Sequence, residues 1–206
     1  QEFECDFGAA VDNALVPLDV ALIATKREAD QDQYRFAPKI IGVDVARYGS
    51  DRTVFFPRQG IAGFKPRVLR DLDTMQVAAA VAESCEKWNP DAVFIDEGGL
   101  GAGVIDRLRQ LGRRECVGVN FGSKALNPQN ENRRAEMWRT MADWIKSGGC
   151  IPDDQDLIRD LCAPTYSHAN SRGRFELESK DDLKARGLPS PDLADALALT
   201  FAELVA

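Results

Sequence analysis

The 206-residue sequence has few of the side chains from which nucleophilic triads and soft-metal sites are built. It contains one histidine, His168, and no CxxC pair among its five cysteines. A single histidine argues against a Ser-His-Asp triad and against a His-rich metal site. The odd number and wide spacing of the cysteines argue against a disulfide framework and a zinc site. Any acid or metal chemistry must therefore rest on carboxylates.

Long apolar runs are also missing. No stretch approaches the roughly 18 apolar residues that a membrane span needs, and no signal peptide is visible at the N-terminus. The hydrophobic fraction of 44% and the charged fraction of 29% are those of an ordinary globular protein. The sequence therefore predicts a globular protein without a membrane partner.

The charge of the chain is negative but unevenly distributed. A formal net charge of −7 argues against a nucleic-acid partner. Residues 101–150, however, hold nine Lys or Arg and five Asp or Glu, a net of +4, which leaves −11 for the rest. This asymmetry is compatible with a local basic face.

Apolar spacing and turn residues predict alternating strands and helices. Strands are expected over 39–46, 52–58, 66–72, 91–99 and 115–122. Helices are expected over 74–88, 99–112, 130–149, 154–163 and 190–206, with a hairpin over 164–179. Thr74 is the predicted N-cap of the first helix, and Ser190 and Pro191 are the predicted N-cap and first residue of the last.

The order of these elements predicts the fold class. Short glycine-containing turns join the first three strands, which indicates an antiparallel meander. The strand at 91–99 follows a helix, so it is expected to lie parallel beside the first strand after a right-handed crossover. The prediction is an α/β fold whose mixed sheet combines the meander with parallel strands and carries helices on both faces.

Carboxylates occur at corresponding places in two of these strands. Asp44 interrupts the apolar run "KIIGVDVA", and Asp96 ends "AVFID". A buried charge is costly, so Asp44 needs a cationic side chain, a proton or a metal. The last helix adds Asp192 and Asp195 on one face. Such an all-oxygen group suits hard divalent cations, and two ions about 4 Å apart support phosphodiester hydrolysis.

Other interpretations of these residues stay open. An aspartate at a strand end is more often a cap or an arginine partner, and Asp192 alone is an ordinary helix-dipole partner. "GLGAG" lacks the spacing of a dinucleotide-binding loop. "GVDVARYGSDRT" loosely resembles the phosphate-binding turn of actin-like sugar or acetate kinases, although no second such segment follows. A non-catalytic module that grips DNA is the third interpretation.

Three segments together carry a more specific resemblance: "IIGVDVARYGSDRTV", "AVFIDEGGLGAGVIDRL" and "FELESKDDLKARGLPSPDLADALALTFA". In this order, over roughly residues 38–205, they resemble the nuclease domain of the large terminase subunit of tailed bacteriophages. That protein is a DNA-packaging motor, and its nuclease has a ribonuclease H-like fold. The resemblance implies an endonuclease that cuts concatemeric viral DNA with Mg²⁺ or Mn²⁺, in a two-metal reaction with water as the nucleophile.

The resemblance also assigns residues. Asp44, Asp96 and Asp195 fall on metal-binding, catalytic positions, and Asp192 and Asp51 match auxiliary acidic positions. Because the acids repel one another, alanine at any of the first three is expected to stop cleavage without loss of stability. The predicted DNA contacts are Arg133, Arg134, Arg139, Arg172, Arg174, Lys180, Lys184 and Arg186.

Residues 1–37 resemble the lead-in from the family's ATPase domain, and residues 38–206 resemble the nuclease domain. No G-x-x-x-x-G-K-S/T occurs, so ATP hydrolysis is not expected. The implied partners are double-stranded DNA and, in the full protein, an ATPase domain, a portal ring and a small terminase subunit. The implied location is the host cytoplasm, and we expect the isolated domain to be monomeric. A docking module would grip the DNA or the portal.

Overall fold

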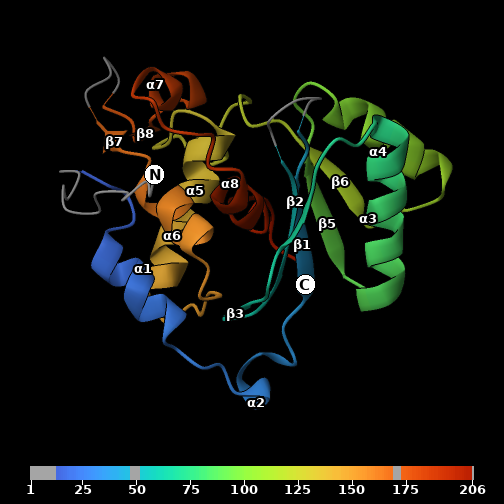
Figure 1. Cartoon of the computed structure of the whole chain (residues 1–206), viewed down its shortest axis with the longest axis horizontal. Coiled ribbons are helices and arrows are strands. Elements are labelled where there is room, and N and C mark those ends of the chain that lie inside the picture. Colours follow the sequence, from blue (N-terminus) through green and yellow to red (C-terminus); the bar gives the residue numbers. More distant parts are fainter. Residues whose placement is uncertain (1–12, 47–51, 169–172, 206) are drawn as a thin grey trace, which may run out of the picture.

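A six-stranded mixed sheet forms the centre of the protein, in a computed structural model that describes residues 13–46, 52–168 and 173–205 (Figure 1). The strands are β1 Lys39–Asp44, β2 Thr53–Gln59, β3 Ala62–Gly63, β4 Arg67–Leu69, β5 Ala92–Asp96 and β6 Cys116–Val119. Their order is β3-β2-β1-β5-β6, with β4 also paired to β2. β2 runs antiparallel to β1, β3 and β4, whereas β1, β5 and β6 are parallel. The predicted mixed sheet is confirmed, with β1 at its centre.

Two layers of helices cover the sheet. The helices are α1 Leu18–Thr25, α2 Gln31–Tyr34, α3 Thr74–Trp88, α4 Gly101–Gln110, α5 Arg133–Lys146, α6 Gln155–Cys162, α7 Lys180–Ala185 and α8 Asp192–Leu199. In Figure 1, α3 and α4 lie on one side of the sheet, and α1, α5, α6 and α8 lie on the other. No helix in the described ranges is long and apolar enough to cross a membrane.

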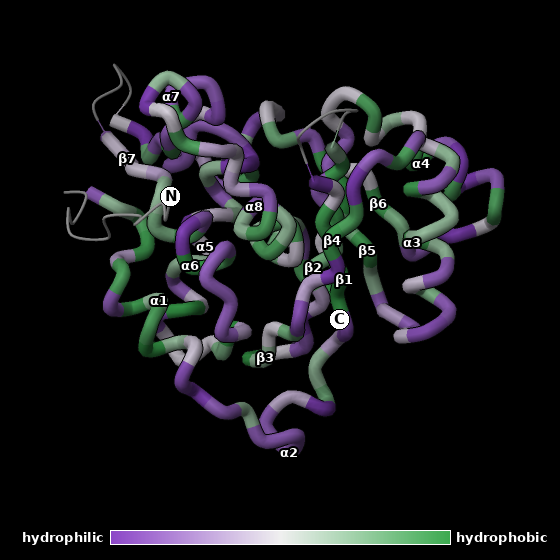
Figure 2. The backbone as a smooth tube through the Cα atoms, in the orientation of Figure 1, coloured by the Kyte–Doolittle hydropathy of each residue, from purple (hydrophilic) through white to green (hydrophobic). Residues whose placement is uncertain are grey.

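Successive side chains of a strand point to opposite faces of the sheet, so each strand contributes residues to two core clusters, one beneath each helix layer. Ile40 packs in the cluster shared with α5, α6 and α8, whereas Ile41 and Val43 pack in the cluster shared with α3 and α4. Figure 2 shows hydrophobic colouring along the central strands and hydrophilic colouring over α2. Counting on along β1, Asp44 belongs to the same face as Ile40, which is the face that α8 covers.

Close contact between β1 and α8 depends on one glycine. A Cβ added at Gly42 would lie 1.9 Å from the carbonyl oxygen of Ala196, which is far inside van der Waals contact. All eight residues of α8 are buried, including both of its aspartates. The missing side chain at residue 42 therefore lets α8 lie directly on the strand that carries Asp44.

Local capping differs from the predictions at two helices. Asp73, not Thr74, is the N-cap of α3, because its carboxylate accepts from the amide of Gln76 while Gln76 reaches back in a capping box. Pro191 stands at the N-cap of α8 and provides no side-chain cap. The α8 start is instead stabilised from outside, because the Leu193 amide donates to Asp160 at 3.1 Å.

Three helices were not predicted. α7 begins after Ser179, whose hydroxyl accepts from the amide of Asp182. α1 and α2 lie in the predicted lead-in, and Ala21 and Ala24 of α1 are fully buried in the core shared with α5 and α6. The predicted hairpin is present as β7 Tyr166–Ser167 and β8 Glu176–Leu177. Its tip, residues 169–172, lies outside the described ranges.

Candidate active site

Three carboxylates converge where the ends of β1 and β5 meet the first turn of α8. Asp44 ends β1, and Asp96 ends the parallel neighbour β5. On β5, Phe94 packs in the cluster of the α8 layer, so the strand period puts Asp96 on that face as well. Asp195 extends this group from the helix. The structure therefore brings together all three residues on which the predicted site is centred.

A lysine ammonium lies between two of these acids. Lys180 Nζ is 3.3 Å from Asp44 Oδ2 and 3.0 Å from Asp195 Oδ2. Burial on its own would lower the pKa of Lys180, but Asp195 and Asp44 raise it well above its ordinary value. Lys180 is therefore charged, and it supplies the counter-charge that Asp44 requires. Lys180 was predicted from the sequence as a DNA contact. In the structure its ammonium is instead paired with Asp44 and Asp195.

Asp195 is held from its other side by two donors on α5. Its Oδ1 accepts from Arg134 Nε at 2.9 Å and from Trp138 Nε1 at 2.7 Å. Burial alone would raise the pKa of Asp195, yet Arg134, Lys180 and Trp138 bring it below its ordinary value. Asp195 is thus ionised and fixed in orientation, and its Oδ2 faces Lys180.

The other two acids hold their protons more tightly than an exposed aspartate does. Burial raises the pKa of Asp44 to about 7, against the opposing effect of Lys180, and repulsion from Asp195, Asp96 and Asp192 adds to the rise. Burial likewise raises the pKa of Asp96, although a hydrogen bond from the Gly98 amide at 3.0 Å opposes it. For both acids burial is the largest cause of the rise in pKa, and repulsion from neighbouring carboxylates adds to it.

The glycine-rich turn after β5 shapes the surroundings of Asp96. A Cβ at Gly101 would lie 1.7 Å from the Asp96 carbonyl oxygen, and a Cβ at Gly98 would lie 3.2 Å from its carboxylate. The turn therefore folds back over the strand end because two of its residues have no side chain. Its function here is close packing around an acid.

Asp192 faces a different cation. Arg52 lies 3.5 Å from Asp192 Oδ2 through Nε, and its other nitrogens bind Asp156 and Asp160 at 3.0 and 3.2 Å. Asp192 is therefore linked to α6 through Arg52, while it still contributes to the charge around Asp44. Asp51, the other auxiliary acid, lies outside the described ranges.

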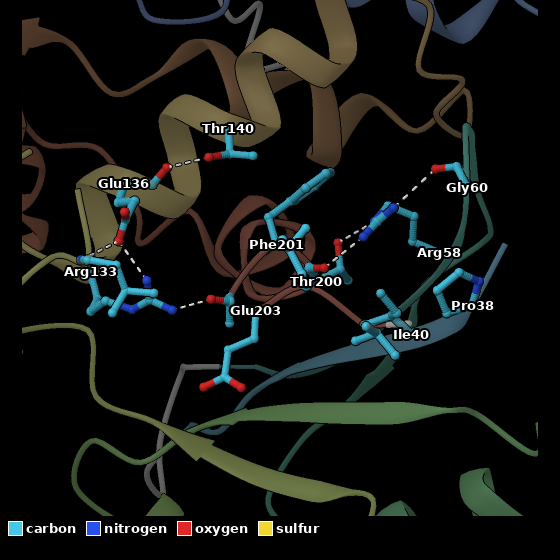
Figure 3. Close-up of a pocket in the computed structure, with 14 residues that line it drawn as sticks. Pro38, Ile40, Arg58, Gly60, Arg133, Glu136, Thr140, Thr200, Phe201 and Glu203 are labelled. Atoms are coloured by element: carbon cyan, nitrogen blue, oxygen red, sulfur yellow. Dashed lines mark hydrogen bonds and ion pairs between the residues drawn. The ribbon is translucent and has the colours of Figure 1, made fainter.

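A small cavity opens at the acids. It has a volume of about 190 Å³, and its lining includes Asp44, Arg52, Lys180, Lys184 and Asp192. A larger pocket, of about 400 Å³, lies at the opposite end of β1 (Figure 3). There Arg58 donates to the hydroxyl and carbonyl oxygens of Thr200, both at 2.7 Å. That pocket contains none of the converging acids.

The predicted DNA contacts fall into two groups. Arg133 and Arg134 are buried and paired with Glu136 and Asp195, so they do not lie on the surface. Among the others, Lys184 is exposed beside the acid cavity. Arg186 pairs with Glu178, Arg174 pairs with Glu131, Arg139 stacks on Phe175, and Arg172 lies outside the described ranges.

The residues present fit a hard divalent cation. The donors are all carboxylate oxygens, and the buried Asp195 Oδ2 accepts no hydrogen bond among the described residues and has only the Lys180 ion pair. Burial raises the pKa of Asp44 and repulsion from neighbouring carboxylates adds to the rise, and a bound cation would oppose both effects. In the described chain, no three of these carboxylates bring an oxygen each within 4.8 Å of one another. In this conformation the Lys180 ammonium takes the position between the acids.

Sequence reasoning missed several residues of this site. One of them is Trp138, for which the usable signal was that a buried indole N–H needs an acceptor. Lys180 was not expected among the acids because α7 was not predicted. Arg52 directly follows the matched segment's Asp51, but its carboxylate partners on α6 are about a hundred residues away.

The fold matches that of solved viral nuclease domains. A mutant nuclease domain of the large terminase subunit gp2 of bacterial virus Sf6, solved with manganese and beta-thujaplicinol, gives a TM-score of 0.78 at 17% identity, covering 94% of this chain and 100% of that chain. The large terminase nuclease of thermophilic phage G20c with bound magnesium gives 0.65 at 17%, covering 93% and 97%. The large terminase nuclease domain of Thermus phage P74-26 gives 0.63 at 14%, covering 92% and 94%.

Neither a protein-family model nor a curated protein sequence matches the chain. The structural matches nevertheless cover nearly the whole chain. The chain therefore has the fold of terminase large-subunit nuclease domains, and the predicted ribonuclease H-like architecture is confirmed.

Proposed function

We propose that this chain is a divalent-metal-dependent DNA endonuclease that cuts concatemeric viral DNA during genome packaging, with water as the nucleophile. The observation that carries the proposal is the meeting of Asp44, Asp96 and Asp195, from two strands and a helix, around the half-buried ammonium of Lys180. The shared fold with terminase nuclease domains supports it. Residues 1–37 would lead from an ATPase domain, and the further partners would be a portal ring and a small terminase subunit.

Asp44, Asp96 and Asp195 would hold the Mg²⁺ or Mn²⁺ ions, for which two is the proposed number. When bound, such ions acidify a water and stabilise negative charge on the phosphate. The chain prepares the ligands for this. Arg134 and Trp138 fix the orientation of Asp195 through its Oδ1.

Lys180 has a separate role in the metal-free protein. Its ammonium offsets the repulsion between Asp44 and Asp195 and contacts the oxygens that a metal would use. It therefore lets the two carboxylates lie close together with less electrostatic repulsion. A bound metal ion would compete with Lys180 for these oxygens.

Substrate contacts are expected to be few and non-specific. Lys184 is exposed beside the acid cavity, where its ammonium can meet a DNA phosphate. With a net charge of −7 the chain has no long-range attraction to a polyanion. Tethering to a motor that already holds DNA would raise the local DNA concentration and compensate for weak intrinsic binding.

Incubation with supercoiled plasmid tests the proposal directly. We expect nicked and linear products with Mg²⁺ or Mn²⁺ and none with EDTA. Plasmids of unrelated sequence should be cut alike, because the candidate contacts reach phosphates and not base edges. ATP turnover without nicking would favour the kinase interpretation, and DNA retention without cutting would favour the docking module.

Replacing Lys184 by alanine should weaken DNA binding without changing the fold, since the side chain is exposed. Loss of one phosphate contact lowers the slope of log affinity against log salt by about 0.9. The measurement is binding and cleavage over a salt series. The matched control is Lys146→Ala, which removes an exposed lysine at the distant C-terminal end of α5. Equal salt slopes for wild type and Lys184→Ala would remove Lys184 from the substrate surface.

A further inference from the structure

A second group of metal-ligating side chains lies on the other face of the sheet. One ligand atom each from Cys85, Glu115 and Cys116 lie within 4.8 Å of one another. Cys85 is in the last turn of α3, and Cys116 is the first residue of β6. Both thiols are nearly buried, at 4% and 7% exposure, and belong to the α3 and α4 layer. Two cysteines far apart in the sequence therefore meet beside a carboxylate.

The position of this group separates it from the acids. The register pairs Cys116 with Val93, at the start of β5, while Asp96 pairs with Val119 at the other end. Val93 packs in the cluster opposite to that of Phe94. The thiol group thus lies at the opposite end of the strands and on the opposite face of the sheet.

One side of the group is open to solvent, and the positively charged side chain of Arg113 lies there. The side chain of Glu115 is 25% exposed, and Arg113 NH1 lies 3.7 Å from its carboxylate. Arg113 also pairs with Glu86, next to Cys85, at 2.5 Å. The group therefore has an entry side and a positive charge nearby.

We propose that Cys85, Cys116 and Glu115 form a binding site for a borderline-soft divalent cation of the Zn²⁺ type. Thiolate sulfur and carboxylate oxygen are ordinary zinc ligands, with bonds of about 2.3 Å and about 2.0–2.2 Å. Side chains already within 4.8 Å need only small rotations to reach one ion. A water completes the four-coordinate shell from the solvent side.

The charges around the site balance when the ion is present. Two thiolates and one carboxylate carry three negative charges, and a divalent ion leaves one. The Arg113 guanidinium beside Glu115 offsets that remaining charge. The C-terminal end of α3 adds a favourable dipole for a cation. The bound ion would link the end of α3 to the start of the edge strand β6. It would do so independently of the proposed nuclease site.

Cobalt titration of the full chain tests this site, because sulfur ligation gives Co²⁺ an intense near-ultraviolet charge-transfer band that carboxylates do not. We expect a band that saturates at one equivalent. It should disappear in Cys85→Ala and in Cys116→Ala, and Glu115→Gln should weaken binding at least about tenfold. Cys162→Ala, a cysteine packed on the other layer, and Asp44→Asn should both retain it.

Two measurements on the unmutated chain guard against variants that fail to fold. Zn²⁺ should slow alkylation of Cys85 and Cys116 but not of Cys162, read by peptide mass mapping. Zn²⁺ at about 100 times its Kd should also raise the Tm by about 5–10 °C. A missing band, a band that survives both cysteine substitutions, or a Cys85–Cys116 disulfide in protein purified without reductant would each overturn the proposal.

Discussion

Asp44→Asn should abolish cleavage and, at the same time, stabilise the metal-free protein at pH 8. Under the proposed function the activity falls because a proposed metal ligand is lost, and several kcal/mol of charge stabilisation correspond to about 10³-fold or more in rate. The stability rises because burying the ionised Asp44 carboxylate destabilises the folded state. Burial raises its pKa from 3.8 to about 7.

The sign of the stability effect follows from which state binds the proton more tightly. A raised pKa means that the folded protein holds the Asp44 proton more tightly than the unfolded chain. This contribution to stability is fully present below pH 4 and is lost as pH rises through 7. At about 1.4 kcal/mol per pKa unit, the loss is on the order of 4 kcal/mol or less. Asparagine resembles the protonated carboxyl and avoids this loss.

Chemical unfolding in EDTA from pH 5 to pH 8 measures the effect. Wild type should lose stability over this range relative to Asp44→Asn, and the two should be similarly stable at pH 5. Saturating Mg²⁺ should then stabilise wild type and leave Asp44→Asn unchanged. A variant that still nicks plasmid at a rate near that of wild type would show that Asp44 is not a ligand.

Asp195→Asn should abolish cleavage and destabilise the protein, although it makes the same chemical change in the same site. Asp195 is the anion against which the buried Arg134 and the Lys180 ammonium are paired. Removing one partner of a buried ion pair costs about 3–5 kcal/mol, because the other charge remains buried. The sequence-based expectation that every acid can be removed without loss of stability therefore does not extend to Asp195.

Each of these two variants is the matched control for the other. Asp44→Asn and Asp195→Asn each remove one carboxylate charge. We therefore expect both variants to lose metal binding to the same extent, while their free energies of unfolding shift in opposite directions. The low pKa of Asp195 also predicts that its contribution persists above pH 4 and fades as pH falls further. If Asp195→Asn proved as stable as Asp44→Asn in EDTA at pH 8, the role assigned to Arg134 and Lys180 would be wrong.

Strand positions of the acids were predictable from the sequence because side-chain alternation is a local rule. Apolar runs located β1 and β5, and their parallel pairing brought Asp44 and Asp96 to one edge. Helix α8 was equally clear from its start signals, although its N-cap was assigned one residue too early. In these elements, local pattern and long-range packing agree.

The remaining parts of the site depend on contacts that sequence spacing does not encode. α7 has six residues and one buried side chain, so its apolar pattern was too short to recognise. Arg134 was assigned to a DNA surface because its charge is plain in the sequence, while its partner Asp195 lies 61 residues away. Trp138 donates to the same carboxylate from 57 residues away. Which buried polar groups pair can be read only from the packed helices.

The contact between Gly42 and Ala196 divides the active site into a fixed part and a removable part. Asp44 and Asp195 belong to elements whose backbones are in close contact, so the packing of α8 on β1 sets their separation. Lys180 comes from a six-residue helix with Leu183 as its one buried residue. A partner that lifts α7 would withdraw the ammonium and leave the carboxylates where they are. The cation that contacts Asp44 and Asp195 could then change while the two carboxylates keep their positions.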